Sequence, residues 1–462
     1  MPKNIIINNK VLDRYQTKAV LCKKRAYLVV AGAGSGKTLT IVAKVDYLIK
    51  HNVKQNKILC ISFTNETVNS LTNKLKENNL NVDVKTFHRL SLDLIGRKYG
   101  IISSNLLEYI TDEFFESLIY NDNTYKLLKY VNNIDYLKKI IISFINQMKA
   151  LNYNEIFILS LLRNKLIDSD DKIILIFILK IYVIYQEELT SVNKIDFNDM
   201  INLAINKIDK LDYFKYSHII IDEYQDTSES KYQLIKKLYE KFNIYLMAVG
   251  DDYQSIYSFT GCNLYLFTKF KKYFKKSKVI KIKRTYRNPY VLVEISRRFI
   301  IKNKNQINKR LISEKCILNS INIVYIKDEI DAFKYITKDF DNIMVLARNN
   351  RDLDNIKSID HEKNIKLLTV HASKGLEEDY VIVLNVVDDT LGFPNKIKDN
   401  KVLSYISNYN HLEEERRLFY VALTRTKIKT FLFTIKGKES IFIKELLSDF
   451  KRRIKIIDLD QK

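Results

Sequence analysis

Short apolar runs alternate with amphipathic segments up to about residue 90. Runs at 27–31, 57–63 and 82–87 have the length and composition of strands, and residues 39–49 carry apolar side chains at helical spacing. Strands that alternate with helices are typical of a parallel sheet, because each crossover between parallel strands needs a helix-sized connection. The pattern predicts an α/β unit.

From about residue 91 to 200 the pattern changes. Long segments rich in Leu, Ile, Tyr and Lys follow one another at helical spacing, and no glycine occurs in this stretch after Gly100. Strand-like runs return at 218–221 and 243–249. We therefore expect a helical subdomain inserted into the first α/β unit, which resumes after it.

A second α/β series completes the pattern. We expect strands at 278–283, 321–326, 342–347, 365–370 and 379–386, then a helix at 412–424, a strand at 429–435 and a final helix. No Pro- or Gly-rich linker separates the two series. The predicted division is a first α/β domain formed by 1–90 and 201–277, a helical insertion at 91–200, a second α/β domain at 278–452 and a tail at 453–462.

The composition favours a polyanionic partner but does not establish one. Lys and Arg number 77 against 54 Asp and Glu, which gives a net charge of +23. Nucleic acid is a common partner of so basic a chain. The abundance of Lys, Asn, Ile and Tyr and the absence of Trp would also follow from an AT-rich coding sequence, so the charge leaves both interpretations open.

The sequence predicts a soluble intracellular protein with reduced thiols. Its four cysteines, at positions 22, 60, 262 and 316, are widely separated and lack the spacing of metal ligands. The N-terminal segment lacks the apolar core of a signal peptide. The longest apolar stretch, 173–185, is interrupted by Lys180 and is too short to cross a bilayer.

A glycine-rich loop leads from the strand at 27–31 into the helix predicted at 39–49. Strand, glycine loop and helix in this order point backbone N–H groups and a helix N-terminus at a phosphate chain. The lysine of such a loop reaches the β- and γ-phosphates, and the next hydroxyl binds Mg²⁺. The strict pattern has glycine where Ala31 stands. The loop predicts nucleoside triphosphate binding by Ala31, Gly32, Ala33, Gly34, Ser35, Gly36, Lys37 and Thr38.

Two adjacent acids end the strand-like run at 218–221. A carboxylate at the carboxyl end of a strand beside a phosphate loop is where Mg²⁺ is held in ATPases of this kind. We expect Asp222 to be that ligand and Glu223 to orient or deprotonate the attacking water. Two Asn-Lys-Ile-Asp sequences, at 193–196 and 206–209, precede this strand. This is the wrong order for a GTPase base-recognition motif, so a GTPase is rejected.

Four stretches resemble motifs of the UvrD/Rep-like superfamily 1 DNA helicases. They are Asp222-Glu-Tyr-Gln-Asp226-Thr, Val249-Gly-Asp-Asp-Tyr-Gln254-Ser-Ile-Tyr257, Thr369-Val-His371-Ala-Ser-Lys374-Gly-Leu-Glu377 and Glu414-Glu-Arg-Arg-Leu-Phe-Tyr-Val-Ala-Leu-Thr-Arg425. All motifs occur in the family's order between about residues 12 and 427. The resemblance implies two RecA-like P-loop domains in tandem, with a helical subdomain inserted in the first, and an ATP- and Mg²⁺-dependent activity on DNA.

The resemblance also implies roles around the nucleotide. Gln254 matches the sensor of the γ-phosphate and the attacking water, a role that suits an amide able to donate and accept. Arg287 and Arg425 match two arginines that stabilise the γ-phosphate across a domain cleft. The residues matched on the nucleoside side are Gln16 at the adenine edge, Tyr286 stacked on the base and Glu377 near the ribose.

For the nucleic acid, the resemblance implies a track for a single strand. Aromatic side chains suit such a track because every base has a face on which they can stack. Phe87, in contrast, is expected to pack in the core. The implied DNA contacts are Phe63, Asn65, Thr86, His88, Tyr257, Phe259, Arg348 and His371.

Two departures from the family pattern stand out. Thr260 precedes Gly261 where the family usually has arginine, which removes one cationic DNA contact. About 20 residues separate Arg348 from Thr369, too few for the second inserted domain, called 2B, of larger members. The chain is expected to be a short form without that domain.

The implied function is ATP-dependent movement along single-stranded DNA, 3′ to 5′, with unwinding at single-strand/duplex junctions in replication, repair or recombination. Replication or repair proteins are the implied partners. One alternative is a translocase that displaces proteins without unwinding. Another is a non-catalytic nucleic-acid-binding protein with a relic nucleotide site, against which the intact catalytic set argues. RNA fits less well as the substrate, because the motifs resemble those of DNA enzymes.

Overall fold

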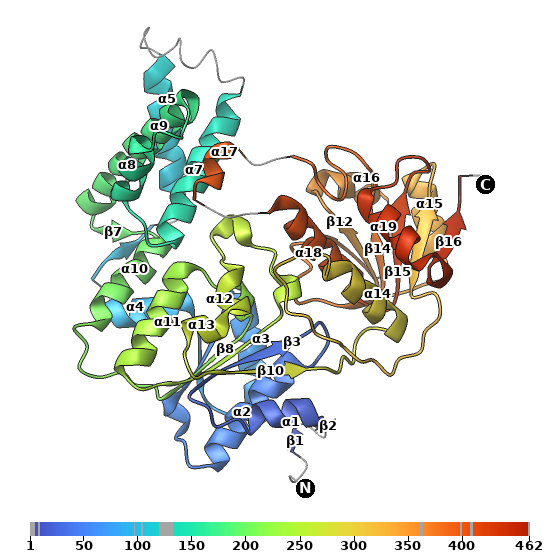
Figure 1. The fold of residues 1–462 in the computed structure, drawn as a ribbon, viewed down its shortest axis with the longest axis horizontal. Helices are drawn as coiled ribbons and strands as arrows, with labels where there is room; N and C mark the ends of the chain where they lie inside the picture. Colours follow the sequence, from blue (N-terminus) through green and yellow to red (C-terminus); the bar gives the residue numbers. More distant parts are fainter. Residues whose placement is uncertain are drawn as a thin grey trace.

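Two six-stranded sheets and a helical region make up the protein (Figure 1). The computed structural model describes residues 5–7, 10–96, 98–102, 105–119, 133–359, 364–397, 400–406 and 410–460. Each sheet is the core of an α/β unit, and the helical region stands above the first unit and beside the second (Figure 1). The expected α/β fold with a helical insertion is confirmed.

The first sheet is parallel throughout, in the order β10-β3-β9-β8-β4-β5. Its strands are β3 (Ala26–Ala31), β4 (Ile58–Ser62), β5 (Asp83–Thr86), β8 (His218–Ile221), β9 (Tyr245–Gly250) and β10 (Lys278–Ile282). Its helices are α1 (Arg14–Val20), α2 (Lys37–Lys50), α3 (Asn65–Lys76), α4 (Phe87–Ile95), α10 (Phe197–Ile208), α11 (Glu229–Lys241), α12 (Leu264–Thr268) and α13 (Phe270–Tyr273). A short hairpin of β1 (Ile6–Ile7) and β2 (Lys10–Val11) precedes α1.

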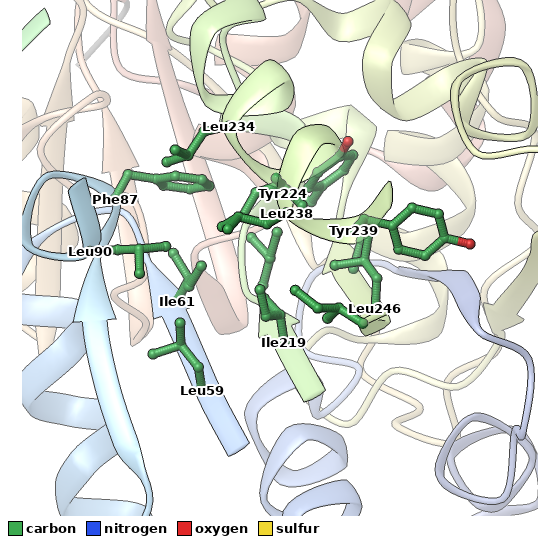
Figure 2. Packing of buried hydrophobic residues seen from close by; sticks show 14 of the residues in the cluster. Leu59, Ile61, Phe87, Leu90, Ile219, Tyr224, Leu234, Leu238, Tyr239 and Leu246 are labelled. Atoms are coloured by element: carbon green, nitrogen blue, oxygen red, sulfur yellow. The ribbon is translucent and has the colours of Figure 1, made fainter. Parts of the chain in front are cut away.

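Both faces of the first sheet are buried. Along β3, Leu28 and Val30 pack into one core cluster, while Val29 and Ala31 pack into the other. Figure 2 shows the first cluster, in which Leu59, Ile61, Ile219 and Leu246 of the sheet lie against side chains of α4 and α11. Helices α1, α2 and α3 cover the opposite face. Burial on both faces explains why these strands are continuous apolar runs in the sequence.

The helical region has its own core. It contains α5 (Asn105–Ile119), α7 (Ile134–Ala150), α8 (Glu155–Arg163) and α9 (Ser169–Ser191), and it joins the first unit through the short parallel pair β6 (Gly100–Ile101) and β7 (Lys194–Ile195). Side chains such as Phe144, Ile145, Leu175 and Ile178 are buried within it. Among the described residues, no helix is long and apolar enough to cross a membrane.

The second sheet is also parallel, in the order β13-β12-β14-β15-β11-β16. Its strands are β11 (Ile321–Tyr325), β12 (Ile343–Ala347), β13 (Ile365–Thr369), β14 (Glu378–Val383), β15 (Thr426–Thr434) and β16 (Lys455–Asp458). Its helices are α14 (Tyr290–Ile300), α15 (Glu329–Thr337), α16 (Asp354–Lys357), α18 (His411–Leu423) and α19 (Ile441–Phe450).

The structure differs from the sequence analysis at one predicted strand and at the predicted tail. The strand predicted at 278–283 was placed in the second series, but β10 pairs with β3 at the edge of the first sheet. Residues 453–462 were expected to be a tail, but β16 pairs with β11 and extends the second sheet. At 278–283 the apolar pattern predicts a strand without specifying its partner, whereas no strand was predicted for the residues of β16. The limits of the units as functional domains stay a prediction.

A short segment of the second unit reaches the helical region. Helix α17 (Lys401–Ser404) lies beside α7 and α9 (Figure 1). The side chains of Val402 and Ile406 are buried in the core of the helical region. Lys401 forms an ion pair with Asp168 over 2.5 Å, and the Tyr405 hydroxyl donates a 2.5 Å hydrogen bond to Asp171. The helical region is therefore attached to both α/β units.

Candidate active site

The chemistry-bearing segments of the first unit meet at one edge of its sheet. The glycine loop follows β3, Asp222 follows β8, Asp251 follows β9 and Phe63 follows β4. Because the strands are parallel, their carboxyl ends lie along the same edge, which is where ligands bind in open α/β sheets. The fold thus brings together motifs that are about 190 residues apart in the sequence.

The glycines of the loop allow close approach of its neighbours. Gly34 and Gly36 have φ values of 66° and 76°, which disfavour any residue with a Cβ. A Cβ at Gly34 would lie 2.3 Å from the Cβ of Arg287, and one at Gly36 would lie 2.6 Å from Nε2 of Gln16. The loop is therefore held between α1 and the segment that contains Arg287.

The nucleoside-side residues lie at this loop. Gln16 is buried and its Nε2 donates a 3.1 Å hydrogen bond to the Ser35 carbonyl. Tyr286 donates through its backbone N–H to the Gly34 carbonyl (2.9 Å) and through its hydroxyl to Asp13 (3.0 Å). The Tyr286 ring remains 45% exposed, so it is free to take part in stacking. Gln16 and Tyr286 thus both contact the loop, and their roles toward a nucleoside stay a prediction.

The loop also fits a phosphate chain by its polar atoms. The Oγ atom of Ser35 is buried and has no hydrogen-bond partner among the described residues. Lys37 opens α2 and its Nζ lies 3.4 Å from a carboxylate oxygen of Glu223. An anion at the N-terminus of α2 would be attracted by the helix dipole and by Lys37, and could accept from Ser35.

The two acids after β8 have opposite protonation tendencies. Burial, reinforced by the charge of Glu223, raises the pKa of Asp222 to about 7. Burial opposes ionisation of Glu223 as well, but Lys37 and Lys374 outweigh it and lower the pKa of Glu223 to about 2. Glu223 also has a φ of 50°, a backbone conformation that is uncommon for residues other than glycine. Glu223 is therefore ionised at neutral pH, as a base must be.

Two arginines approach the same region from the second unit. Arg425, which follows α18, is fully buried and donates a 2.8 Å hydrogen bond to Oε1 of Gln254. Burial, followed by the charge of Arg287, lowers the pKa of Arg425 to about 9. Arg287 donates to Glu377 over 2.6 Å. An anion beside Arg425 would stabilise the charge that burial and Arg287 disfavour.

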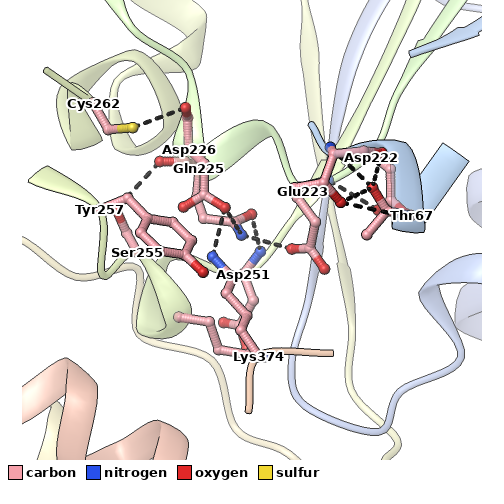
Figure 3. Close-up of polar contacts among 12 residues, drawn as sticks. Thr67, Asp222, Glu223, Gln225, Asp226, Asp251, Ser255, Tyr257, Cys262 and Lys374 are labelled. Atoms are coloured by element: carbon pink, nitrogen blue, oxygen red, sulfur yellow. Dashed lines mark hydrogen bonds and ion pairs between the residues drawn. The ribbon is translucent and has the colours of Figure 1, made fainter. Parts of the chain in front are cut away.

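A glutamine that sequence analysis did not single out connects these groups. The Gln225 side chain donates a 2.6 Å hydrogen bond to Glu223 and accepts a 2.9 Å bond from the backbone N–H of Asp251 (Figure 3). The next residue, Asp226, pairs with Lys374 of the second unit over 2.5 Å (Figure 3). The Lys374 ammonium lies 4.6 Å from the centre of the Tyr257 ring. A continuous set of contacts therefore runs from Glu223 to Tyr257.

A second missed residue, Lys309, is fully buried between two acids. Its Nζ lies 2.5 Å from Asp251 and also forms an ion pair with Asp252. Burial opposes the charge of Lys309, but these two carboxylates raise its pKa above the ordinary value. Lys309 thus fixes the segment that carries Gln254. No spacing in the sequence indicates this role, because Lys309 lies far along the chain from its partners.

The implied DNA residues other than Arg348 form two groups. Tyr257, Phe259 and His371 form an aromatic cluster with ring centroids 5.9–6.3 Å apart, and Phe259 is 54% exposed. Phe63, Asn65, Thr86 and His88 lie at the carboxyl ends of β4 and β5. Phe87, between Thr86 and His88, is buried in the core as expected.

Three of these residues are engaged within the protein. The Thr86 hydroxyl accepts from the N–H of Arg89 and caps α4. Arg348 forms a 2.8 Å ion pair with Glu415, so its charge is already neutralised. The ring of His88 contacts that of Phe197 at 5.2 Å.

Comparison of the sequence with known protein families identifies the family to which these motifs belong. Residues 12–275 match the UvrD/REP helicase N-terminal domain. The chain belongs to the UvrD/Rep helicase family. The matched stretch contains the phosphate loop, both acids and Gln254, and it includes the helical region inserted between them.

Several helicases of this family are similar to the chain. DNA helicase IV of Escherichia coli K12 is 25% identical over 95% of the chain and 70% of its own length. The ATP-dependent DNA helicase Rep of Buchnera aphidicola from Acyrthosiphon pisum is 32% identical over 71% of the chain and 51% of its own length. A probable DNA helicase II homolog of Mycoplasma capricolum is 25% identical over 88% of the chain and 58% of its own length. The chain thus spans between about half and 70% of these relatives.

Proposed function

We propose that the protein is an ATP- and Mg²⁺-dependent motor that moves 3′ to 5′ along single-stranded DNA and unwinds duplexes at junctions, in replication, repair or recombination. The observation that supports this best is the convergence of Lys37, Glu223 and Gln254 with Arg425 across the boundary of the two α/β units. A site completed by two units is suited to couple phosphoryl transfer to their relative movement.

The proposed chemistry divides among the residues as follows. Glu223, ionised, accepts a proton from the attacking water, while the Gln254 amide orients that water. Lys37, Arg287 and Arg425 stabilise charge on the phosphates, which is the main task in phosphoryl transfer. Gln16, Tyr286 and Glu377 hold the nucleoside.

The proposed metal ligands are those that the sequence motifs indicate. The Thr38 hydroxyl and the Asp222 carboxylate would hold Mg²⁺, which neutralises charge that develops on the phosphates. No group of three or more His, Cys, Asp or Glu side chains suited to a metal occurs in the described residues. This agrees with an ion that takes few protein ligands and otherwise binds water and phosphate oxygens.

Strand displacement tests the proposal. We expect the protein to release the short strand of a duplex with a 3′ single-stranded tail when ATP and Mg²⁺ are present, and to leave a 5′-tailed duplex intact. Lys37→Ala should be inactive on both. Displacement of the 5′-tailed substrate only would reverse the proposed direction.

A second candidate function is movement along DNA without unwinding. It is favoured by the short connection between Arg348 and Thr369. About 20 residues separate them, too few to form the second inserted domain of larger relatives. In that case neither tailed duplex would be unwound. ATP-dependent removal of streptavidin from biotinylated single-stranded DNA would then reveal the movement.

A further inference from the structure

Lys231 places a positive charge directly over the aromatic residues at the carboxyl ends of β4 and β5. It lies in the first turn of α11, where its backbone N–H donates to the Ser228 cap. Its Nζ is 4.8 Å from the centre of the Phe63 ring and 5.8 Å from that of Phe87. A lysine at a helix N-terminus opposes the helix dipole, so both features create positive potential at one point.

Other cations around the aromatic residues are already paired. Arg348 pairs with Glu415, Lys374 with Asp226 and Arg89 with Asp93. In the part of the chain that the structure describes, the Lys231 ammonium has neither an ion pair nor a hydrogen bond. Its contacts are with the faces of the two rings, which stabilise a cation less than an ion pair with a carboxylate would.

The field of Lys231 extends across the surface where a strand would lie. Burial lowers the pKa of His88, and the charge of Lys231 lowers it further. Burial raises the pKa of Cys262, and the charge of Lys231 opposes that increase. His88 belongs to the group beside β5, while Cys262 follows the segment of Tyr257 and Phe259. Of the acids near Lys231, Asp226 pairs with Lys374, although the charge of Lys231 also opposes the rise in its pKa that burial causes, and Glu229 bonds with Gln233 and Asn263.

We propose that Lys231 binds a backbone phosphate of the single strand, at the position where a base stacks against Phe63. This inference rests on the proposed function and adds a contact that the motifs did not indicate. Proteins that bind single strands of any sequence combine aromatic faces for the bases with cations for the phosphates. Phe63 and Lys231 provide one of each at the same place, and a phosphate would neutralise a half-buried cation that the protein leaves unpaired.

The salt dependence of DNA affinity tests this contact. The full chain would be titrated against a fluorescein-labelled oligothymidylate over a range of NaCl concentrations. Each phosphate neutralised on a single strand contributes about 0.7 to the slope of log K against log salt. Lys231→Met keeps the aliphatic stem on the rings and removes the charge, so we expect weaker binding and a slope shallower by about 0.7. Lys231→Arg should retain the slope.

The matched control is Lys334→Gln, which is exposed on α15 of the second unit, whereas Phe63 and Phe87 belong to the first unit. It changes the net charge equally and should leave affinity and slope as in the wild type. A Lys231→Met slope equal to that of the wild type would overturn the contact, and Lys231→Gln gives the same test if the methionine variant does not fold. A wild type that does not bind the oligonucleotide would overturn the proposed function and this contact with it.

Discussion

The Arg425 guanidinium donates a 2.8 Å hydrogen bond to the side-chain oxygen of Gln254. Arg425 follows α18 of the second unit, whereas Gln254 follows β9 of the first and donates in turn to Asp251 over 2.6 Å. This bond therefore spans the boundary between the units. It connects the position of the second unit to the residue proposed to orient the attacking water.

Arg425→Lys should retain a positive charge but lose the planar fork that reaches both Gln254 and the Leu376 carbonyl. We expect kcat for ATP hydrolysis to fall by about 10³-fold, as for arginines that stabilise phosphoryl transfer. Nucleotide affinity, followed with a fluorescent ATP analogue, should change only a few-fold. Arg298→Lys on the exposed face of α14 is the control. Normal turnover by Arg425→Lys would show that Arg425 only supports the fold.

Glu223→Gln should bind ATP but not turn it over. The amide keeps the shape and a hydrogen bond with Gln225, but it cannot accept the proton of the attacking water. Fluorescent-nucleotide binding measures the first property and phosphate release the second. Hydrolysis at the wild-type rate would remove Glu223 from the role of base.

Lys309→Met should destabilise the first unit. It would leave Asp251 and Asp252 buried without their common partner, and loss of one member of a buried ion pair costs about 3–5 kcal/mol. Thermal unfolding measures the effect as a lower transition temperature. Arg310→Met, at the exposed neighbouring position, should leave the transition unchanged. Equal transitions in the two variants would mean that the acids are protonated and do not need Lys309.

Val402→Asp should release α17 from the helical region. The new carboxylate would be buried in an apolar core without a partner, which favours detachment of a segment only one turn long. Hydrogen exchange should then become faster at residues 402–406 and on the adjoining face of α7. Ser404→Asp, exposed on the same helix, is the control. Unchanged exchange in Val402→Asp would contradict the attachment.

The histidines proposed to contact DNA should contribute no pH dependence to the affinity between about pH 6 and 8. Burial, with a contribution from Lys231, lowers the pKa of His88 to about 4, and burial with Arg348 lowers that of His371 to about 4. Protonation would strengthen binding of a polyanion, but it begins only well below pH 6. Titration at constant ionic strength should show less than about a threefold change. A large gain at pH 6 that His371→Gln removes would contradict this.

The sequence was sufficient to identify candidate functional residues where those residues form a short continuous run. The phosphate loop and the pair Asp222–Glu223 are each a short run of residues directly after an apolar strand. The strand, the turn and the functional side chains can therefore be recognised in one stretch of sequence. Parallel pairing then aligns their ends, and in the structure Nζ of Lys37 lies 3.4 Å from a carboxylate oxygen of Glu223. The membership of the family, which the comparison shows, was also contained in these motifs.

The sequence was insufficient to predict contacts between residues that lie far apart along the chain. The apolar residues of β10 are compatible with either sheet, and only tertiary packing places the strand beside β3. Lys309 is one of many lysines, and its acids lie more than 50 residues away. The attachment of Val402 to the helical region is likewise a contact between segments without a common local pattern.

Steady-state ATP hydrolysis with and without single-stranded DNA tests the central claim most directly, with RNA of the same length as a control. The account predicts strong stimulation by DNA, because contacts from Tyr257 to Glu223 connect the proposed strand-binding surface to the base. RNA should stimulate far less. ATP that is bound but hydrolysed at the same rate with and without DNA would contradict a motor that moves along DNA.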